Sequence, residues 1–253
     1  MNEAHRSVSE AAPKCLAISL DPSGERCAQF LANNSHLTVE VVHGIRGKDL
    51  SGLDRKDRGL VTPEAGRSGL VSDGSVGCAA SHQLLWQRVA SSGESALILE
   101  DDAITHPRIL DFIAAHRDRL EQMDLLRFGI NTDSVLDAEA PNGLREVRLF
   151  RQRYPQPDLI RQFLDRTPIE DVRIHRMYKS FGQCCTFVTP RGARRLLELA
   201  LPLTLEPTEV PLVARALPGI STDRRLNHFY GEMAAYVTVP FLAWSPNTDT
   251  ATR

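Results

Sequence analysis

Apolar residues in this chain gather in short continuous runs that alternate with stretches in which they recur at helical spacing. A short apolar run bounded by turn residues is typical of a buried strand. Such runs, together with segments rich in β-branched residues, predict strands at 15–20, 37–42, 96–99, 125–128, 184–188 and 236–239. The first of them ends at the turn sequence Asp21-Pro22-Ser23-Gly24.

The stretches between these runs predict helices. Apolar positions recur at helical spacing over 74–90, and Ser91-Ser92-Gly93 ends that helix. We also expect helices over 24–32, from Pro107 onward, over 190–199 and over 222–229. Strands that alternate with helices in this way indicate an α/β fold with a mainly parallel central sheet.

Other segments carry no clear periodicity. Residues 1–12 and 246–253 are expected to be tails, which leaves 13–245 as a single domain. Residues 44–73 are predicted to form a long loop, and the proline-rich residues 202–218 a connection.

A basic, partly helical insertion is predicted at about 140–180. Between Arg145 and Lys179 there are nine Arg or Lys against five Asp or Glu. One interpretation is a binding surface for anionic lipid headgroups, phosphorylated sugars or a partner. The alternative is a solvated surface excursion without a specific task.

Composition removes several classes of protein. The 253 residues are 42% hydrophobic and 25% charged, as in an ordinary globular domain. The net charge of -2 disfavours a nucleic-acid binder. Five cysteines without a CxxC pair predict free thiols in a reducing compartment instead of a zinc or disulfide framework. We expect a cytoplasmic protein without a signal peptide or membrane span, which allows peripheral contact with a membrane.

Three consecutive carboxylates, Glu100, Asp101 and Asp102, directly follow the predicted strand 96–99. Ligands of open α/β sheets bind at the carboxyl ends of strands. Crowded carboxylates repel one another unless a cation compensates them, and Mg²⁺ or Mn²⁺ prefers oxygen ligands. The triplet therefore predicts a metal that holds a diphosphate. The alternative is a solvated turn before a helix.

Three further residues are candidates for the site. Small residues from Gly77 onward would let a ligand approach Ser81 and His82, although close packing of a helix on the sheet explains them equally well. Asp223 could act as a general base, or it could cap a helix. The chain has no GxGxxG, GxxxxGK[ST], GxSxG or HExxH motif.

Taken together, several segments resemble glycosyltransferase family 25, which includes lipooligosaccharide β-galactosyltransferases and collagen galactosyltransferases. The strongest is Ala96-Leu-Ile-Leu-Glu-Asp-Asp-Ala103, preceded by Gly77-Cys-Ala-Ala-Ser-His82 and Trp86. Similar segments are Ile18–Arg26, Val42–Leu50, Phe187–Leu197 and Tyr236–Pro240. The resemblance covers most of residues 14–240 apart from the basic insertion.

This resemblance implies a GT-A-like, Rossmann-like fold and a metal-dependent, inverting transfer of a hexose. The donor would be a uridine diphosphate sugar, typically of galactose, and the acceptor a glycan such as lipooligosaccharide. The implied roles are Mn²⁺ or Mg²⁺ binding by Glu100 and Asp102, general base catalysis by Asp223, and donor binding by Ser19, Asp21, Arg26, Ser81, His82 and Asp101.

The chain departs from the family pattern in its nucleotide-binding half. Pro22, His43, Arg46 and Ala80 stand where other residues are usual. Two alternatives therefore stay open. One is a non-catalytic homologue of the same fold that binds a glycan or a nucleotide sugar. The other is a Mg²⁺-dependent phosphoryl- or nucleotidyl-transferase. The sequence does not predict the oligomeric state.

Overall fold

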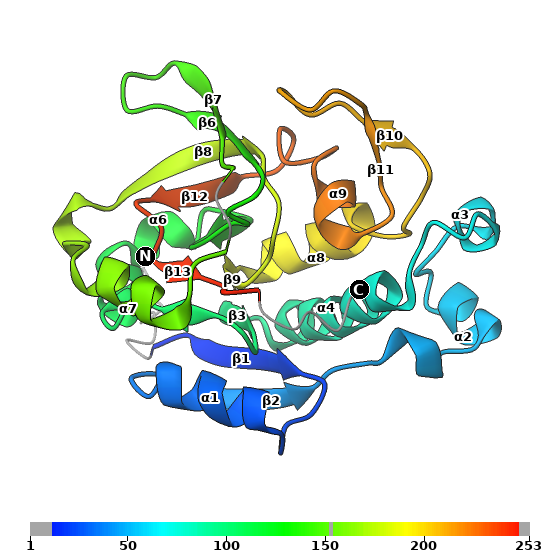
Figure 1. Cartoon of the computed structure of the whole chain (residues 1–253), viewed down its shortest axis with the longest axis horizontal. Helices are drawn as coiled ribbons and strands as arrows, with labels where there is room; N and C mark the ends of the chain where they lie inside the picture. The colour runs from blue at the N-terminus through cyan, green and yellow to red at the C-terminus, as the bar shows by residue number, and fades with distance from the viewer. Residues whose placement is uncertain (1–11, 152–153, 248–253) are drawn as a thin grey trace, which may run out of the picture.

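A computed structural model describes residues 12–151 and 154–247. Nearly all of the predicted N-terminal tail and most of the predicted C-terminal tail lie outside these residues. A nine-stranded sheet runs through the molecule in the order β2-β1-β3-β9-β5-β12-β8-β6-β7 (Figure 1). The strands are β1 (Lys14–Ser19), β2 (Val39–His43), β3 (Ala96–Glu100), β5 (Leu125–Arg127), β6 (Val135–Glu139), β7 (Arg145–Leu149), β8 (Arg173–Lys179), β9 (Cys185–Val188) and β12 (Ala235–Val239).

The pairing of β1 brings the first candidate residues together. It pairs in parallel with β2 on one side and β3 on the other, and Ile18 lies opposite Glu100. Because parallel strands end at the same edge, Ser19 and the acidic triplet share that edge. β9 lies antiparallel between β3 and β5, and β5 pairs in parallel with β12. The predicted α/β class is confirmed.

Helices cover both faces of the sheet. They include α1 (Glu25–Asn33), α4 (Asp73–Ser92), α5 (Ile109–Ala115), α6 (Arg117–Leu120), α8 (Pro190–Leu199) and α9 (Thr222–Leu226). Side chains alternate along β3, so that Leu97 and Leu99 join one hydrophobic core and Ile98 joins the other. Phe112 belongs to the first core and Trp86 to the second. Burial on both faces explains why β3 is continuously apolar.

The prediction that residues 44–73 form one long loop is wrong in part. It contains the 3-10 turn η1 (Gly47–Asp49) and the helices α2 (Gly52–Asp57) and α3 (Pro63–Arg67), which lie beside the start of α4 (Figure 1). Ser51 forms a capping box with Asp54, and the Thr62 side chain caps α3. Two short helices with good caps can form where the apolar periodicity is too short to reveal them.

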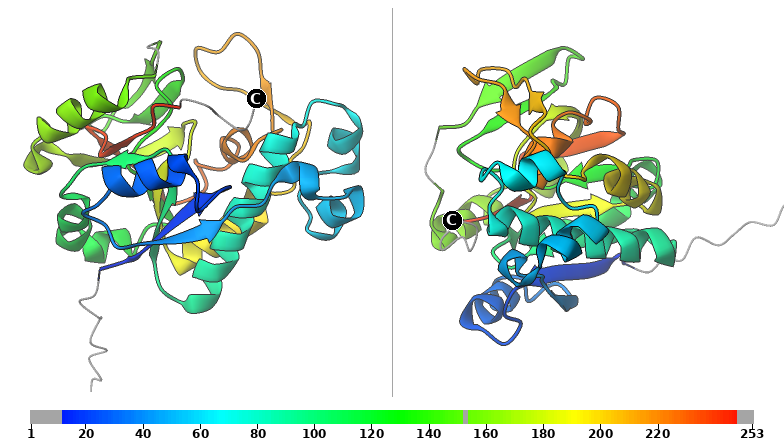
Figure 2. Two further views of the ribbon diagram at one scale, coloured as in Figure 1. Left: turned by 60° about the horizontal axis from the view of Figure 1, so that its bottom comes forward. Right: turned by 90° about the vertical axis from the view of Figure 1, so that its right-hand side faces the viewer.

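The segment predicted as a basic insertion forms part of the sheet. β8 pairs antiparallel with β12, and β6 and β7 extend the sheet beyond it. This edge lies far from β2 and α1 (Figures 1 and 2). The predicted helical part is α7 (Pro157–Asp165). In β8 the basic residues Arg173, Arg176 and Lys179 are three residues apart, so its sequence lacks the period of two that marks a half-buried strand.

Smaller elements complete the structure: η2 (Ile169–Asp171), the strand pair β10 (Pro207–Thr208) and β11 (Leu217–Pro218), and the pair β4 (Ile104–Thr105) and β13 (Ala243–Trp244). Among the described residues, no helix is both long enough and apolar enough to cross a membrane.

Candidate active site

A cleft of about 1110 Å³ opens at the edge where β1 and β3 end. Its wall is formed by the turn after β1, by η1, by the start of α4, by residues 182–184 and by the start of α9. All of the residues predicted for the site line this one cleft: Ser19, Asp21, Arg26, Ser81, His82, Glu100, Asp101, Asp102 and Asp223. The fold thus joins residues from positions 19 to 223.

Asp101 connects the turn after β3 to β1 and α1. Ser19 Oγ donates to Asp101 Oδ2 at 2.6 Å, and Arg26 Nε donates to Asp101 Oδ1 at 2.7 Å. Both oxygens therefore have partners within the protein. Asp21 lies beside this group, because its backbone N–H donates to Ser19 Oγ at 3.3 Å. These contacts fix the turn that carries the triplet.

Asp102 is held less completely than Asp101. A terminal nitrogen of Arg26 lies 3.2 Å from Asp102 Oδ2, and the side chain is 10% exposed. Its other oxygen, Oδ1, is buried and has no hydrogen-bond partner among the described residues. Burial and the nearby charge of Glu100 raise the pKa of Asp102 to about 6. The triplet is therefore not a solvated turn, and Asp102 has a carboxylate oxygen with which it can coordinate a cation.

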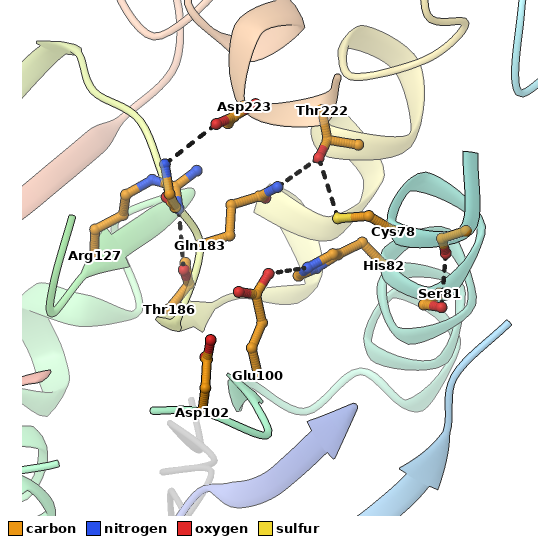
Figure 3. A network of polar contacts seen from close by, with 12 residues as sticks. Cys78, Ser81, His82, Glu100, Asp102, Arg127, Gln183, Thr186, Thr222 and Asp223 are labelled. Carbon is orange, nitrogen blue, oxygen red and sulfur yellow. Dashed lines mark hydrogen bonds and ion pairs between the residues drawn. The ribbon is translucent and has the colours of Figure 1, made fainter. Parts of the chain in front are cut away.

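Glu100 lies beside Asp102 but faces the helix α4 (Figure 3). Its Oε1 is 3.2 Å from His82 Nε2. Burial opposes the charged form of Glu100, but the hydrogen bond and charge of His82, with further help from Arg127 and Arg26, hold the pKa of Glu100 below its ordinary value. Glu100 is thus a carboxylate, and a cation placed near it and Asp102 would relieve the crowding of negative charge.

Asp223 lies across the cleft from the triplet, in the first turn of α9 (Figure 3). Its Oδ1 accepts from Ser221 Oγ and from the backbone N–H of Arg224, and the Gly182 N–H lies 3.4 Å from its Oδ2. The N-cap position belongs to Ser221, so Asp223 is not the cap itself. A half-buried carboxylate held by three donors and facing a cleft is suited to accept a proton from a bound hydroxyl.

Residues 12–210 match the family model described as glycosyltransferase family 25 (LPS biosynthesis protein). The chain belongs to glycosyltransferase family 25. The match includes β1, α4 and the acidic triplet, and it ends before α9, so that Asp223 lies beyond it. No curated protein matches the chain at a significant level.

Membership of family 25 assigns this chain to the glycosyltransferases of lipopolysaccharide biosynthesis, and its cleft has features suited to such an enzyme. The twenty-residue helix α4 begins in the cleft, and an N-terminus of this kind favours anions such as phosphates. Four cationic side chains line the same cleft: Arg26, Arg46 and Lys48, and Arg224 in α9. A diphosphate fits this combination of backbone donors and positive charge.

Ser81 has a structural contact in this family 25 enzyme. Its hydroxyl donates to the carbonyl of Gly77 and accepts from the backbone N–H of Ile45, both at 2.8 Å. A Cβ on Gly77 would lie 2.6 Å from the Ile45 carbonyl oxygen, and a Cβ on Gly47 only 1.9 Å from that of Asp73. Both glycines are therefore needed for α4 to approach η1, and Ser81 fixes that approach.

Three residues of the site were not predicted from the sequence: Arg127, Gln183 and Thr222. Gln183 Nε2 donates to Thr222 Oγ1 at 2.6 Å, which joins the segment 182–184 to the start of α9. Arg127 is buried and contacts the Gly182 carbonyl and the Tyr230 hydroxyl, so it holds the segment that faces Asp223. A charged residue within the apolar run 125–128 was the one sequence feature that could have indicated a role for Arg127. No local sequence pattern indicated a role for Gln183 or Thr222.

Proposed function

We propose that this family 25 glycosyltransferase is metal-dependent and inverting. It transfers a hexose, with galactose the first candidate, from a uridine diphosphate sugar to a glycan acceptor such as lipooligosaccharide. Among the alternatives, family membership favours sugar transfer over nucleotidyl transfer. The observation that supports the metal-dependent mechanism is the buried Oδ1 of Asp102, which has no hydrogen-bond partner in the described part of the chain and lies beside the charged Glu100.

Glu100 and Asp102 have the oxygen donors that Mn²⁺ or Mg²⁺ prefers. When bound there, the cation would stabilise negative charge on the departing nucleoside diphosphate. The chain itself contributes the start of α4 and the cations Arg46 and Lys48, which we propose bind the phosphates. Arg26 supports this site through its ion pairs with Asp101 and Asp102.

The acceptor side is formed by α9 and the segment 182–184. Inversion requires an acceptor hydroxyl to attack from the face opposite the diphosphate, and its proton must be removed as the bond forms. We assign this step to Asp223, which accepts the proton on a carboxylate oriented by Ser221 and Gly182. Arg127 keeps Gly182 in place through its carbonyl.

We further propose that the enzyme works in the cytoplasm, and at the inner face of the membrane when its acceptor is lipid-linked. All five cysteines are free, which suits a reducing compartment.

The test combines transfer and binding. Purified protein is incubated with UDP-galactose or UDP-glucose, truncated lipooligosaccharide and Mn²⁺, Mg²⁺ or chelator, and the anomeric configuration of the product is determined by NMR. Calorimetry then measures uridine diphosphate binding with and without Mn²⁺ for the wild type, for Asp102→Ala and for the exposed control Asp118→Ala. We expect Mn²⁺-dependent binding that Asp102→Ala alone abolishes. If uridine diphosphate binds equally well without Mn²⁺ and to Asp102→Ala, the metal assignment is refuted. A product with retained anomeric configuration would refute inversion.

A further inference from the structure

A thiol, an imidazole and a carboxylate meet on the wall of the cleft. Cys78 Sγ, a ring nitrogen of His82 and a carboxylate oxygen of Glu100 all lie within 4.8 Å of one another. Cys78 and His82 are four residues apart in α4, so their side chains share one face of the helix. Glu100 approaches them from the end of β3 (Figure 3).

The spacing of these donors is close to that of ligands on one tetrahedral ion. With bonds of about 2.0–2.2 Å to Zn²⁺, a nitrogen and an oxygen ligand lie about 3.3–3.5 Å apart. His82 Nε2 and Glu100 Oε1 are 3.2 Å apart. A sulfur ligand at about 2.3 Å would lie roughly 3.5–3.7 Å from each of them. Starting from donor separations of at most 4.8 Å, the thiol side chain reaches this position with a shift of about 1 Å.

A second layer of contacts holds the thiol and the imidazole. Gln183 Nε2 donates to Thr222 Oγ1 at 2.6 Å, so the threonine hydroxyl can direct its own proton to Cys78 Sγ, 3.8 Å away. Such a donor stabilises a thiolate. The His82 side chain is 4% exposed and packs against Trp86, with ring centroids 5.6 Å apart. Supporting contacts of this kind orient the ligands of metal sites.

Access to the cluster comes from the cleft. The Glu100 side chain is 32% exposed, and both Glu100 and Cys78 line the cleft. An ion can therefore enter from solvent, and a water molecule or substrate oxygen can supply a fourth ligand. Three protein ligands with one open position is an arrangement that Zn²⁺ adopts readily.

We propose that Cys78, His82 and Glu100 form a binding site for Zn²⁺ or another thiophilic divalent cation. The mixed sulfur, nitrogen and oxygen donor set selects such ions over Mg²⁺ and Mn²⁺, which prefer oxygen. On binding, the Cys78 thiol and the protonated His82 ring each release a proton to solvent, so that sulfur binds as the thiolate and the imidazole as the neutral ring. One consequence rests on the proposed function: because Glu100 would belong to both sites, Zn²⁺ would displace Mn²⁺ and inhibit sugar transfer.

Cobalt spectroscopy tests the binding itself and does not depend on any enzymatic activity. The full chain is freed of metal with a chelator, kept reduced with a non-thiol reductant and titrated anaerobically with Co²⁺. We expect a thiolate-to-cobalt charge-transfer band in the near ultraviolet that saturates at one equivalent and is removed by added Zn²⁺. No such band in the wild-type protein would refute the proposal.

Two cysteine variants identify the sulfur ligand. Cys78→Ser should lose the charge-transfer band and bind Zn²⁺ at least about 100-fold more weakly. Cys27→Ser is the matched control, because Cys27 is a buried cysteine near Asp101 and should not contribute to the band. Loss of the band in Cys27→Ser but not in Cys78→Ser would overturn the assignment. Glu100→Gln should weaken Zn²⁺ binding while keeping a cobalt–thiolate band. Circular dichroism confirms that each variant is folded.

Inhibition is measured separately, in the Mn²⁺-dependent transfer assay. Zn²⁺ should inhibit the wild type, and Cys78→Ser should be resistant. A cobalt–thiolate band without zinc inhibition would support the binding site and count against the sharing of Glu100. An inactive enzyme that still shows the band would count against the proposed function alone.

Discussion

Glu100 and Asp102 lie two residues apart at the end of β3, yet their carboxylates have different partners. Glu100 accepts from His82 at 3.2 Å, whereas Asp102 keeps one buried oxygen without a hydrogen-bond partner among the described residues. Burial and the charge of Glu100 make the ionised form of Asp102 unfavourable.

The first prediction concerns the pH dependence of stability in the metal-free protein. Folding raises the pKa of Asp102 from 3.8 to about 6, so the folded state binds this proton more tightly than the unfolded state. Stability from this group is present below pH 4 and is lost as the pH rises through about 6. Asp102→Asn does not titrate and should therefore be more stable than the wild type by ~1–3 kcal/mol at pH 8.

Urea unfolding at several pH values, with chelator present, checks this expectation. The advantage of Asp102→Asn should shrink as the pH falls from 7 to 4. Added Mn²⁺ should stabilise the wild type and leave Asp102→Asn unchanged. A pH-independent difference between the two proteins would contradict the raised pKa.

The second prediction concerns Arg26, which connects α1 to the acidic triplet. Arg26→Met removes its ion pairs with Asp101 and Asp102. We expect the donor to bind about 10–100-fold more weakly, because the turn that carries the triplet loses its charged hydrogen bonds. Calorimetry with uridine diphosphate and Mn²⁺ measures the change. Arg58→Met, on an exposed surface outside the cleft, should bind the donor like the wild type.

The third prediction separates proton removal from donor binding. Asp223→Asn keeps an oxygen that can accept from the Ser221 hydroxyl and the Arg224 N–H, while its NH₂ group replaces the oxygen that faces the Gly182 N–H and cannot take a proton from the acceptor. We expect kcat for transfer to fall about 10²–10⁴-fold, while the affinity for uridine diphosphate stays within about twofold. Steady-state kinetics and calorimetry give the two numbers. A variant with weaker donor binding and an unchanged kcat would place Asp223 on the donor side.

The fourth prediction tests the close approach of α4 to η1. In Gly77→Ala the new Cβ would lie 2.6 Å from the Ile45 carbonyl oxygen and 2.7 Å from the Gly47 nitrogen. Both atoms belong to the backbone and cannot move aside cheaply, so we expect a loss of about 2–3 kcal/mol in the free energy of unfolding. Chemical denaturation measures it. In Gly52→Ala the Cβ meets nothing within 4 Å, and stability should change by less than about 0.5 kcal/mol.

Local patterns determined much of this protein from its sequence alone. The apolar run at 96–99 and its acidic triplet identified β3 and the floor of the cleft, because a strand buried on both faces must be continuously apolar. The periodicity over 74–90 identified α4, and the combined motifs identified family 25. Patterns of this kind depend on residues a few positions apart in the chain, so they can be recognised in the sequence without the structure.

Tertiary structure alone decided which of these residues act together and in what state. The cluster of Cys78, His82 and Glu100 exists because α4 packs beside the end of β3, and Gln183 and Thr222 come into contact from distant parts of the chain. Burial and the charge of Glu100 raise the pKa of Asp102, whereas the hydrogen bond and charge of His82 lower the pKa of Glu100 against the effect of burial. The electric field at a carboxylate depends on charges and solvent in three dimensions, and no spacing along the chain reveals it.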